Sequence, residues 1–360
     1  MKISILQENL SKAALSISKI VSSKPQLPIL SNFLIKAEKG RISFLATDLS
    51  ISMGLTVGGK VEEEGEVSVP AKEFTALMSQ LPAGKIDLSS EKDALSVKSG
   101  SFKARLVGAS GEEFPKVEPP SGKGLEIKAG DLSLLLRRTI FVTAKDDSRP
   151  VLTGIKLTGP EKGEIKAMAT DGYRLSVVTV PAGGAIDAAA VIPAKFLSEA
   201  GKFSGDAGID LSINKSGEVG VAGEDGWLSG RTLAGEFPPA EKIIPQEFEL
   251  EISVNRSELE RAVKIAAIFA RSVANIIKWE IKSGKLKVSA NSPQVGENET
   301  VLEVEGKGEG EIAFNGRYLL DYLGSTDEET VNFSMINSLK PGVFKTKNYL
   351  HVIMPVRVQK

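Results

Sequence analysis

The sequence contains no cysteine, a single histidine and few aromatic residues, which make up 6% of the chain. Without cysteine there can be no disulfide, thiolate metal site or cysteine nucleophile, and this absence is typical of proteins from a reducing compartment. The single histidine, His351, leaves no second imidazole for a catalytic triad or a common type of zinc site. No GxxxxGK(S/T) phosphate-binding loop is present either, so the sequence shows no site for nucleotide hydrolysis.

Long hydrophobic runs are also missing. No stretch approaches the roughly 20 apolar residues of a membrane span, and the opening MKISILQENL lacks the unbroken apolar segment of a signal peptide. We therefore expect a soluble, cytoplasmic protein. The 360 residues are too many for one typical domain, and 41% of them are hydrophobic, so two or three domains can each bury a core.

The sequence has little net charge, −1 at pH 7. A protein that gripped DNA with its whole surface would be clearly basic. Any contact with nucleic acid must therefore come from segregation of charge within the chain.

What the sequence does contain is an internal repeat. The triplet Ala-Thr-Asp at 46–48 recurs at 169–171 and, in the altered form Ala-Asn-Ser, at 290–292. Each copy ends a strand-like run of alternating apolar and polar residues. Two further markers keep the same order and a near-constant spacing, namely a strand-to-helix segment (EVSVPAKEF at 66–74, AVIPAKFL at 190–197, IAFNGRYLL at 312–320) and Glu-Phe-Pro at 113–115 and 236–238. Three markers in register predict repeated units rather than chance matches.

The units span 1–118, 125–245 and 250–360, and proline-rich linkers follow the first two. Because the period far exceeds the roughly 20–50 residues of solenoid repeats, we interpret the units as domains. Each opens with an amphipathic helix and continues with alternating strands, a second helix and more strands. The apolar faces of the first helices are formed by Leu10, Ala13, Ala14, Ile17 and Val21; by Leu132, Leu135, Leu136 and Ile140; and by Leu259, Ala262, Val263, Ala266 and Ala270. The predicted class is α+β, with two helices plus antiparallel sheets in each domain and the helices on one side of the sheets.

The helical segments are basic, and the remainder of the chain is acidic. Five of the six helical segments carry a net positive charge, and basic residues point away from the apolar face of each first helix. A basic helical face suits DNA phosphates, which are contacted without regard to base sequence. The candidates from charge and helix position are Lys12, Arg137, Lys195, Lys202 and Arg261, and Arg138 and Lys264 are also predicted to point outward. Ordinary solvated surface charge stays open as the alternative for each of them.

Four parts of the chain carry a resemblance to a known family: LPILSNFLI (27–35) with ATDL (46–49), SRPVLTGI (148–155) with ATDGYRLS (169–176), FNGRYLLDYL (314–323) and YLHVIMPVR (349–357). In this order and at these intervals they resemble the bacterial DNA sliding clamps, the beta subunit of DNA polymerase III, over the whole chain. The resemblance implies a non-catalytic processivity factor without a cofactor or metal. It also implies a head-to-tail homodimer in which six domains form a ring around double-stranded DNA, with helices lining the hole.

The resemblance further implies contacts at the ring interface. Leu106, Ile268 and Phe269 match positions where the two copies meet. Ala104 departs from the family pattern, because a larger aromatic residue stands there in familiar members. Ordinary core packing stays open as the alternative for Ile268 and Phe269. For DNA, Lys24 matches a basic loop position that approaches the duplex, as does Arg149.

A peptide-binding pocket between the second and third domains is also implied, for the polymerase catalytic subunit, the clamp loader and other DNA polymerases or repair proteins. Carried over position by position, it comprises Leu152, Thr170, Gly172, Tyr173, Arg174, Leu175, Pro238, Lys242, Ile243, Asn315, Tyr318, Val352, Met354, Pro355, Val356 and Arg357. Apolar members of this set would bury side chains of a docked peptide, while Arg174, Asn315 and Arg357 would bond its polar groups. Tyr173 and Lys242 replace a histidine and an arginine seen in some members of the family. Core packing is the alternative interpretation of the apolar members.

Three remaining polar residues fit structural roles. Asp48 and Asp171 end equivalent strands, which predicts turn roles rather than metal binding. His351 lies in the last apolar strand and is predicted to be packed there rather than to act as a base or ligand.

Two other functional classes are kept as alternatives. A hydrolase working with paired carboxylates would need a catalytic pair in one domain and gives no reason for threefold repetition. A ring or scaffold that binds only proteins would not be retained on circular DNA.

Overall fold

Six α-helices and four antiparallel sheets make up the part of the chain that the structure, a computed structural model, describes. The described residues are 1–21, 25, 27–121, 124–146, 148–184, 186, 189–203, 208–214, 216–223, 225–272 and 274–357. They fall into two compact units, the first formed by Met1–Glu126 with Lys202–Thr232 and the second by Ile127–Gly201 with Leu233–Lys360. The chain therefore enters each unit twice.

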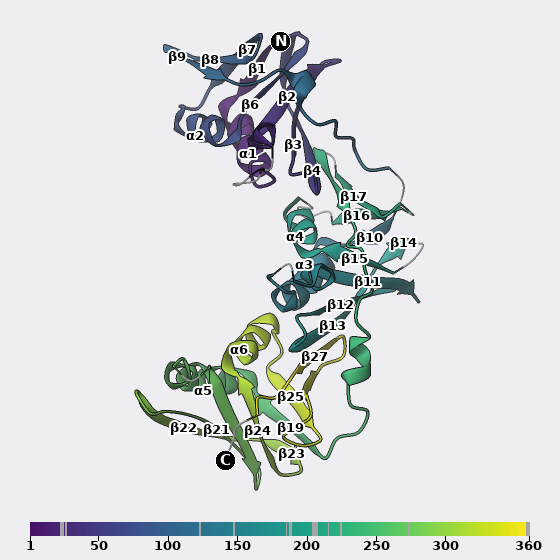
Figure 1. Cartoon of the computed structure of the whole chain (residues 1–360), viewed down its shortest axis with the longest axis vertical. Helices are drawn as coiled ribbons and strands as arrows, with labels where there is room; N and C mark the ends of the chain where they lie inside the picture. The colour runs from purple at the N-terminus through teal and green to yellow at the C-terminus, as the bar shows by residue number, and fades with distance from the viewer. Residues whose placement is uncertain are drawn as a thin grey trace. The chain divides into compact units, whose positions relative to one another are not determined.

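The helices are amphipathic, as the spacing of apolar residues predicts. They are α1 (Gln7–Ile17), α2 (Ala71–Gln80), α3 (Ala129–Thr139), α4 (Ala194–Phe203), α5 (Arg256–Ala270) and α6 (Gly316–Ser325). The predicted apolar face of α5 is buried, and so is that of α1 except Val21, which lies beyond the helix and is partly exposed. In α3 Leu132 and Leu135 are buried, whereas Leu136 and Ile140, just after the helix, are only partly covered. Figure 1 shows α1 and α2 packed together in the first unit, as α5 and α6 are in the second. No helix among the described residues is long and apolar enough to cross a membrane.

Two sheets lie mainly in the first unit. One has the strand order β5 (Gly59–Glu63), β1 (Lys2–Leu6), β7 (Lys85–Glu91), β8 (Ala94–Ser99) and β9 (Phe102–Val107). In the other, the order is β16 (Ile209–Ile213), β17 (Glu218–Gly223), β18 (Gly226–Arg231), β4 (Ile51–Val57), β3 (Arg41–Thr47), β2 (Asn32–Glu38) and β6 (Gly65–Pro70). The short strands β10 (Leu125–Ile127) and β14 (Gly183–Gly184) precede β16 in the order of the same sheet.

Two sheets also belong to the second unit. The longer one has the order β15 (Ala190–Pro193), β11 (Gly154–Glu161), β12 (Glu164–Thr170), β13 (Arg174–Pro181), β27 (Tyr349–Ile353), β26 (Gly342–Lys345), β25 (Thr330–Met335), β19 (Leu250–Asn255) and β23 (Glu305–Lys307). The shorter one has the order β22 (Gly296–Glu303), β21 (Lys285–Ser292), β20 (Ile276–Lys282) and β24 (Gly310–Asn315). Single turns of 3-10 helix connect these elements at Pro28–Ser31, Gly111–Glu113, Ile140–Val142, Pro150–Thr153 and Ala240–Ile243.

Consecutive repeats are joined by strand pairing. β4 of the first repeat pairs antiparallel with β18 of the second, and we name this ladder the first seam. β13 of the second repeat pairs in the same way with β27 of the third, which is the second seam. Each of the longer sheets therefore combines strands from two repeats.

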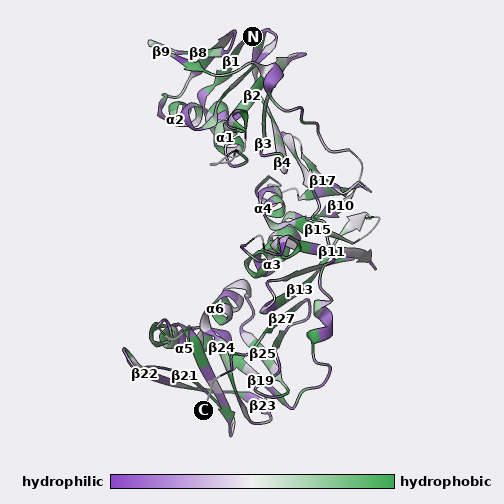
Figure 2. Ribbon diagram, viewed as in Figure 1, coloured by the Kyte–Doolittle hydropathy of each residue, from purple (hydrophilic) through white to green (hydrophobic). Residues whose placement is uncertain are grey.

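The cores consist of branched aliphatic residues with a few clustered aromatic rings. In the third repeat Trp279 makes edge-to-face contacts with Phe314 and Phe333, with ring centres 5.5 and 5.2 Å apart. The rings of Phe344 and Tyr322 pack against each other in a tilted arrangement, with centres 4.5 Å apart. Such contacts stabilise a core beyond the area they bury. Figure 2 shows hydrophobic and hydrophilic residues intermixed along the helices, as amphipathic packing requires.

The turn roles of the two repeated aspartates are confirmed. Asp48 Oδ1 accepts hydrogen bonds from the backbone N–H of Ser50 and Ile51 at 3.0 and 2.8 Å. Asp171 Oδ1 accepts the equivalent pair from Tyr173 and Arg174 at 2.9 and 3.0 Å. An aspartate that caps its own turn in this way holds the following strand in register.

The packing of His351 is also confirmed. Its side chain is fully buried, the ring stacks on Tyr322 with centres 5.1 Å apart, and Nδ1 lies 2.9 Å from Ser176 Oγ. Burial, assisted by the positive charge of Arg174, holds the pKa of the imidazole well below its ordinary value. The ring is therefore neutral at physiological pH.

We expect His351 to make the stability of the fold depend on pH between about 5 and 7. The unfolded chain takes up a proton below about pH 6.5 while the buried ring stays neutral, so stability is present above that pH and is lost as pH falls. The expected loss is about 1.4 kcal/mol per pH unit below 6.5. Urea unfolding followed by the fluorescence of the two tryptophans, Trp227 and Trp279, measures it.

His351→Gln is the control. Because the chain has no other histidine, this variant should lose most of the slope between pH 5 and 7. The same slope in both proteins would contradict the assignment.

Candidate functional site

The basic residues predicted on the helices are mostly exposed. Lys12 on α1 and Arg261 on α5 are exposed and have no ion-pair partner among the described residues. Lys195 and Lys202 are exposed on α4. Lys24 lies outside the described residues. The four described side chains have the reach and charge for phosphate contacts, and all four are exposed.

The two arginines of α3 differ from each other. Arg137 is exposed and its guanidinium lies 2.5 Å from the carboxylate of Asp327. The prediction that Arg138 points outward is wrong, because this side chain is only 6% exposed and lies over the ring of Tyr349, 4.8 Å from its centre. The end of α3 is covered by the neighbouring repeat, which the helical period of α3 alone does not reveal.

Arg149 lies beside the residues predicted to bind peptide. Its Nη1 is 3.9 Å from the point where a Cβ on Gly172 would stand. The side chain is exposed, so it can serve either a nucleic-acid phosphate or an acidic group of a docked protein.

The residues of the predicted peptide pocket come from five segments of the second unit, at positions 152, 170–175, 238–243, 315–318 and 352–357. The turn before β13 and the segment after β27 are tied together, because Met354 N–H donates to the carbonyl of Tyr173 at 2.8 Å. Val356 N–H donates to the carbonyl of Ala313 in β24, also at 2.8 Å, which brings the start of α6 alongside. We name the predicted set the peptide surface.

The linker after the second repeat supplies another segment. Phe237 and Ala240 pack into a core cluster that also contains Leu175 and Val352. This anchoring leaves Ile243 with 43% of its surface exposed. An exposed apolar side chain on an anchored linker is suited to contact a ligand.

Exposure divides the peptide surface into a supporting layer and an outer layer. Leu152, Leu175 and Val352 are buried, so they shape the surface from below. The outer layer contains Tyr173, which is 64% exposed, and the more exposed members of the linker and the last segment. The exposed members are Gly172, Tyr173, Lys242, Ile243 and Arg357, and Pro238, Asn315, Tyr318, Met354, Pro355 and Val356 are partly exposed.

Arg174 holds this surface together from inside. Its guanidinium donates to Asp171 at 3.0 Å, to Asp321 at 2.6 Å and to the carbonyl of Phe141 at 2.6 Å. It also lies over the ring of Tyr318, 4.4 Å from the centre. The side chain is 7% exposed, so its donors serve the fold rather than a ligand. Among the described residues the side chain of Asn315, by contrast, makes one hydrogen bond, in which its Oδ1 accepts from the N–H of Arg317 as an N-cap.

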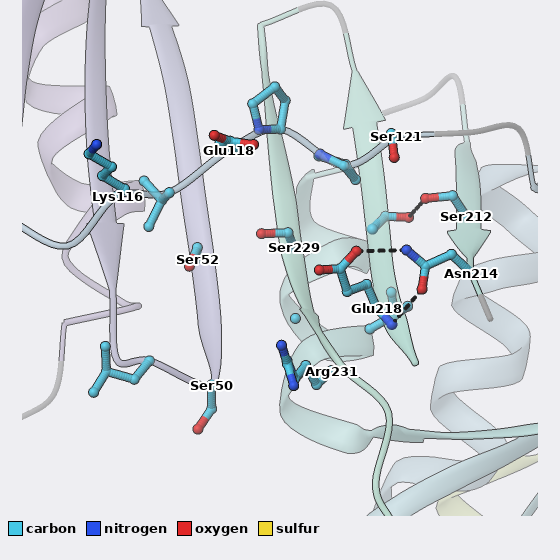
Figure 3. Close-up of a pocket in the computed structure, with 17 residues that line it drawn as sticks. Ser50, Ser52, Lys116, Glu118, Ser121, Ser212, Asn214, Glu218, Ser229 and Arg231 are labelled. Atoms are coloured by element: carbon cyan, nitrogen blue, oxygen red, sulfur yellow. Dashed lines mark hydrogen bonds between the residues drawn. The ribbon is translucent and has the colours of Figure 1, made fainter. Parts of the chain in front are cut away.

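The first unit has a cleft at the place that corresponds to the peptide surface by the repeat. It encloses about 450 Å³ between the turn before β4, the linker after the first repeat and the ends of β16 to β18 (Figure 3). Ser52 and Ser229 stand there at the positions of Leu175 and Val352. Arg231 on its rim is exposed. At these two positions the first unit therefore has hydroxyl groups where the second unit has apolar side chains.

Comparison with known proteins agrees with this architecture. Profiles of the DNA polymerase III beta subunit match the chain in order, the N-terminal domain over residues 1–118, the central domain over 126–239 and the C-terminal domain over 241–357. A beta sliding clamp from Synechococcus elongatus is 30% identical over 377 residues and spans the whole of both chains. The chain belongs to the bacterial sliding clamp family. A second clamp of this family, from Chlamydia pneumoniae, is 29% identical over 99% of both chains.

Solved sliding clamps have the same fold. The beta subunit from Thermotoga maritima superposes with a TM-score of 0.92 at 26% identity, covering 99% of this chain and all of the other. The clamp from Pseudomonas aeruginosa bound to griselimycin superposes with a TM-score of 0.92 at 28% identity and the same coverage. As a member of the family, the chain is a non-catalytic processivity subunit of DNA polymerase III, with three clamp domains.

Sequence reasoning missed a group of charged residues on two strands at the edges of sheets. Lys103 and Arg105 on β9 are exposed, and so are Glu297 and Glu299 on β22. The signal was present as alternation, because in each strand the charged residues share one face. What the sequence did not reveal is that each of these strands ends its sheet, with no outer neighbour in the part of the chain that the structure describes.

We expect Arg174→Met to reduce the free energy of unfolding by about 2 to 3 kcal/mol, below the usual cost for a fully buried pair because both aspartates keep some contact with solvent. Arg174→Lys should recover only part of this loss, since an ammonium cannot serve three acceptors in the geometry of a guanidinium. Urea unfolding measures both. Arg317→Met, at an exposed position on α6, is the matched control and should change stability by less than about 0.5 kcal/mol.

Proposed function

We propose that two copies of this chain join head to tail into a closed ring that encircles duplex DNA and tethers the polymerase to it. The observation that carries the proposal is a pair of unpaired strand edges. β9 ends one sheet of the first unit and β22 ends one sheet of the second, and neither has an outer neighbour among the described residues. Such an edge leaves backbone N–H and C=O groups available for a further strand.

The internal repeat identifies the missing neighbour. β4, β13 and β22 hold the same place in the three repeats, because each follows the Ala-Thr-Asp or Ala-Asn-Ser marker. In both seams this strand pairs with the last strand of the next repeat. By the same rule β22 requires the last strand of a first repeat, which is β9 of a second copy. This third seam, made twice, closes two chains into a ring without a free edge.

The two observed seams also fix the register expected at the third. Ser52 opposes Ser229 in the first seam, and the repeat places Glu297 at the position of Ser52. A two-residue turn joins β8 to β9 in the first repeat, and another joins β17 to β18 in the second. Counted from these turns, Arg105 takes the position of Ser229. The expected ladder therefore sets Glu297 directly opposite Arg105.

The next pair on the same face repeats this complementarity, with Glu299 opposite Lys103. Neither base has an ion-pair partner in the described chain, whereas Glu299 has only a long contact of 3.7 Å with Lys287. Opposite charges directly across an antiparallel ladder stabilise the pairing and select its register. On the other face of the seam, Leu106, Ile268 and Phe269 would supply apolar contact, and Ile268 is 57% exposed in the single chain.

A ring explains how a nearly neutral chain serves DNA. Topological linkage prevents escape without tight binding, and phosphate contacts set no barrier to sliding because they are independent of base sequence. The basic residues of the helices, with Lys24 and Arg149, are proposed to supply these contacts. The acidic remainder would discourage DNA from binding elsewhere.

The peptide surface is proposed to dock the polymerase catalytic subunit, the clamp loader and other polymerases or repair proteins. Its outer layer combines exposed apolar groups such as Tyr173, Ile243 and Met354 with the free amide donors of Asn315. Short peptide motifs are bound in this way, through apolar anchors with a few polar contacts.

We expect the protein, once loaded onto nicked circular DNA by a clamp loader, to co-elute with the circle at moderate salt and to be lost when the DNA is linearised. Equal retention on circle and line would mean ordinary DNA binding. Retention on neither, with a loader verified on a known clamp, would favour the protein-only scaffold.

We expect Arg105→Glu to raise the dissociation constant of the dimer by about 10-fold or more, because it sets two like charges opposite each other. Adding Glu297→Arg in the same chain should restore the dimer. Sedimentation at several concentrations measures both effects. Lys60→Glu, at an exposed position on β5 at the opposite edge of the same sheet, is the matched control and should change little. Failure of the reversed pair to restore dimerisation would contradict the register.

A further inference from the structure

The cleft beside the first seam, which we name the seam cleft, lies wholly within the first compact unit. Its walls are the turn before β4, the strands β16 to β18 and the linker at 116–121 (Figure 3). The linker sits directly on the sheet, because a Cβ on Gly220 would stand only 1.9 Å from Cβ of Pro120. The chain thus forms a cleft of about 450 Å³, a size typical of ligand sites.

Arg231 brings an unused positive charge to the seam cleft. It stands directly opposite Glu218 in the ladder of β17 and β18, where opposite charges attract each other. The carboxylate of Glu218 instead accepts a hydrogen bond of 2.6 Å from Nδ2 of Asn214. Arg231 is exposed and has no hydrogen bond or ion pair with any residue that the structure describes. Its guanidinium donors therefore remain available to an acidic group of a ligand.

Hydroxyl groups lie next to this charge. Ser229 is two residues before Arg231 on β18, so both side chains are on the same face of the sheet. Ser52 stands opposite Ser229 across the seam, and Ser50 follows at the exposed end of β4. The hydroxyls of Ser50 and Ser229 make no hydrogen bond within the described ranges. A hydroxyl both donates and accepts, so these groups suit the alternating N–H and C=O groups of an extended peptide.

An apolar side chain also lines the seam cleft. Leu49 is 55% exposed, and its backbone has a φ of +71°, a left-handed conformation that is costly for a residue with a side chain. The second repeat has Gly172 at this position, with a φ of +90° that glycine adopts without strain. The turn itself therefore does not require leucine. Its presence keeps an apolar group exposed at the cleft in spite of the strain.

The seam cleft differs in chemistry from the peptide surface at equivalent positions. The correspondence that matches Ser229 with Val352 places Arg231 at the position of Met354. It also places Ser50 at the position of Tyr173. A charged donor and a hydroxyl thus replace two large side chains, so the two sites should select different ligands.

The balance of charge in the seam cleft disfavours a polyanion. Two exposed bases, Lys116 and Arg231, and two exposed acids, Glu118 and Glu218, line it. Duplex DNA carries one negative charge per roughly 1.7 Å of its axis, and the two carboxylates would repel such a ligand. A ligand with a single acidic group satisfies Arg231 without this penalty.

We propose that the seam cleft is a second docking site, for an extended protein segment that carries an acidic side chain next to an apolar one. The acidic group binds Arg231, the apolar side chain packs on Leu49, and the backbone between them bonds the hydroxyls of Ser50 and Ser229. The site needs neither the ring nor the peptide surface, because all of its groups belong to one unit of one chain.

The probe for this site is a library of random hexapeptides, selected on the full chain. We expect some enriched peptides to carry Asp or Glu beside an apolar residue and, once synthesised, to bind Arg231→Met at least about 10-fold more weakly. Replacing the acid of such a peptide with its amide should weaken binding to the unmodified protein by a similar factor and to Arg231→Met very little. Arg41→Met, at an exposed position on β3 of the same sheet, is the matched control and should bind normally.

Ile243→Asp separates the two sites, because it places a charge on the peptide surface. Peptides of the seam cleft should bind this variant as they bind the unmodified protein. The proposal is overturned if no enriched peptide depends on Arg231, or if every peptide that loses affinity does so with Ile243→Asp alone. Neither result would bear on the ring, which the reversal of Arg105 and Glu297 tests separately.

Leu49→Gly distinguishes binding from folding. Glycine suits the left-handed backbone of this turn, so we expect little change in the midpoint of urea unfolding. The same variant should bind the acidic peptides about 5-fold more weakly, because the apolar contact is lost. Unchanged peptide affinity together with a lower unfolding midpoint would mean that Leu49 serves the fold, and would contradict the proposed contact.

Discussion

The pairing of backbone groups at strand edges is the constraint on which the rest of this structure depends. Each repeat offers one edge after its marker and another at its last strand, and both need hydrogen-bond partners. Within the chain, neighbouring repeats satisfy each other at the first and second seams. The positions of the helices, the linkers and the peptide surface follow from these two ladders, because each element is attached to strands whose register is already fixed.

The same ladder tolerates very different side chains. At equivalent central positions the chain places Met53 with Leu228, and Ser176 with His351. Backbone pairing supplies the geometry in each case, so the side chains are free to diverge between packing and polar contact. The side chains beside the two seams differ as well. Leu175 and Val352 support an apolar surface at the second seam, whereas Ser52 and Ser229 line the cleft at the first (Figure 3).

Local patterns in the sequence were enough to predict the repeat, the buried faces of α1 and α5, the two aspartate turns and the packing of His351. Each of these features depends on residues that are close in the sequence, or is found by direct comparison of the repeats. Arg138 was misplaced because its environment is set by a segment about two hundred residues away, including Tyr349. Among the residues predicted to bind peptide, Tyr173 is exposed and Leu175 is buried. The alternating pattern of a single strand does not predict this difference.

The charged strand edges were missed for a related reason. Lys103 and Glu299 look like ordinary surface residues until the strand order is known, since only topology shows that β9 and β22 lack an outer neighbour. The significance of Ala104 also changes with the structure. In the sequence it is a departure from a family pattern, and in the register of the seams it is the small member of a defined pair.

The equivalence of the seams has a consequence for how such a chain can arise. A single repeat cut from it would carry both kinds of edge at once, and each edge is the template for the other. Copies of that fragment would add to one another in one direction, and the arc would end only when the last copy met the first. A chain of three fused repeats fixes most of these encounters covalently. Gene fusion of this kind turns a concentration-dependent assembly of many small subunits into one that needs only two, and leaves the remaining junctions as the places where affinity can be adjusted.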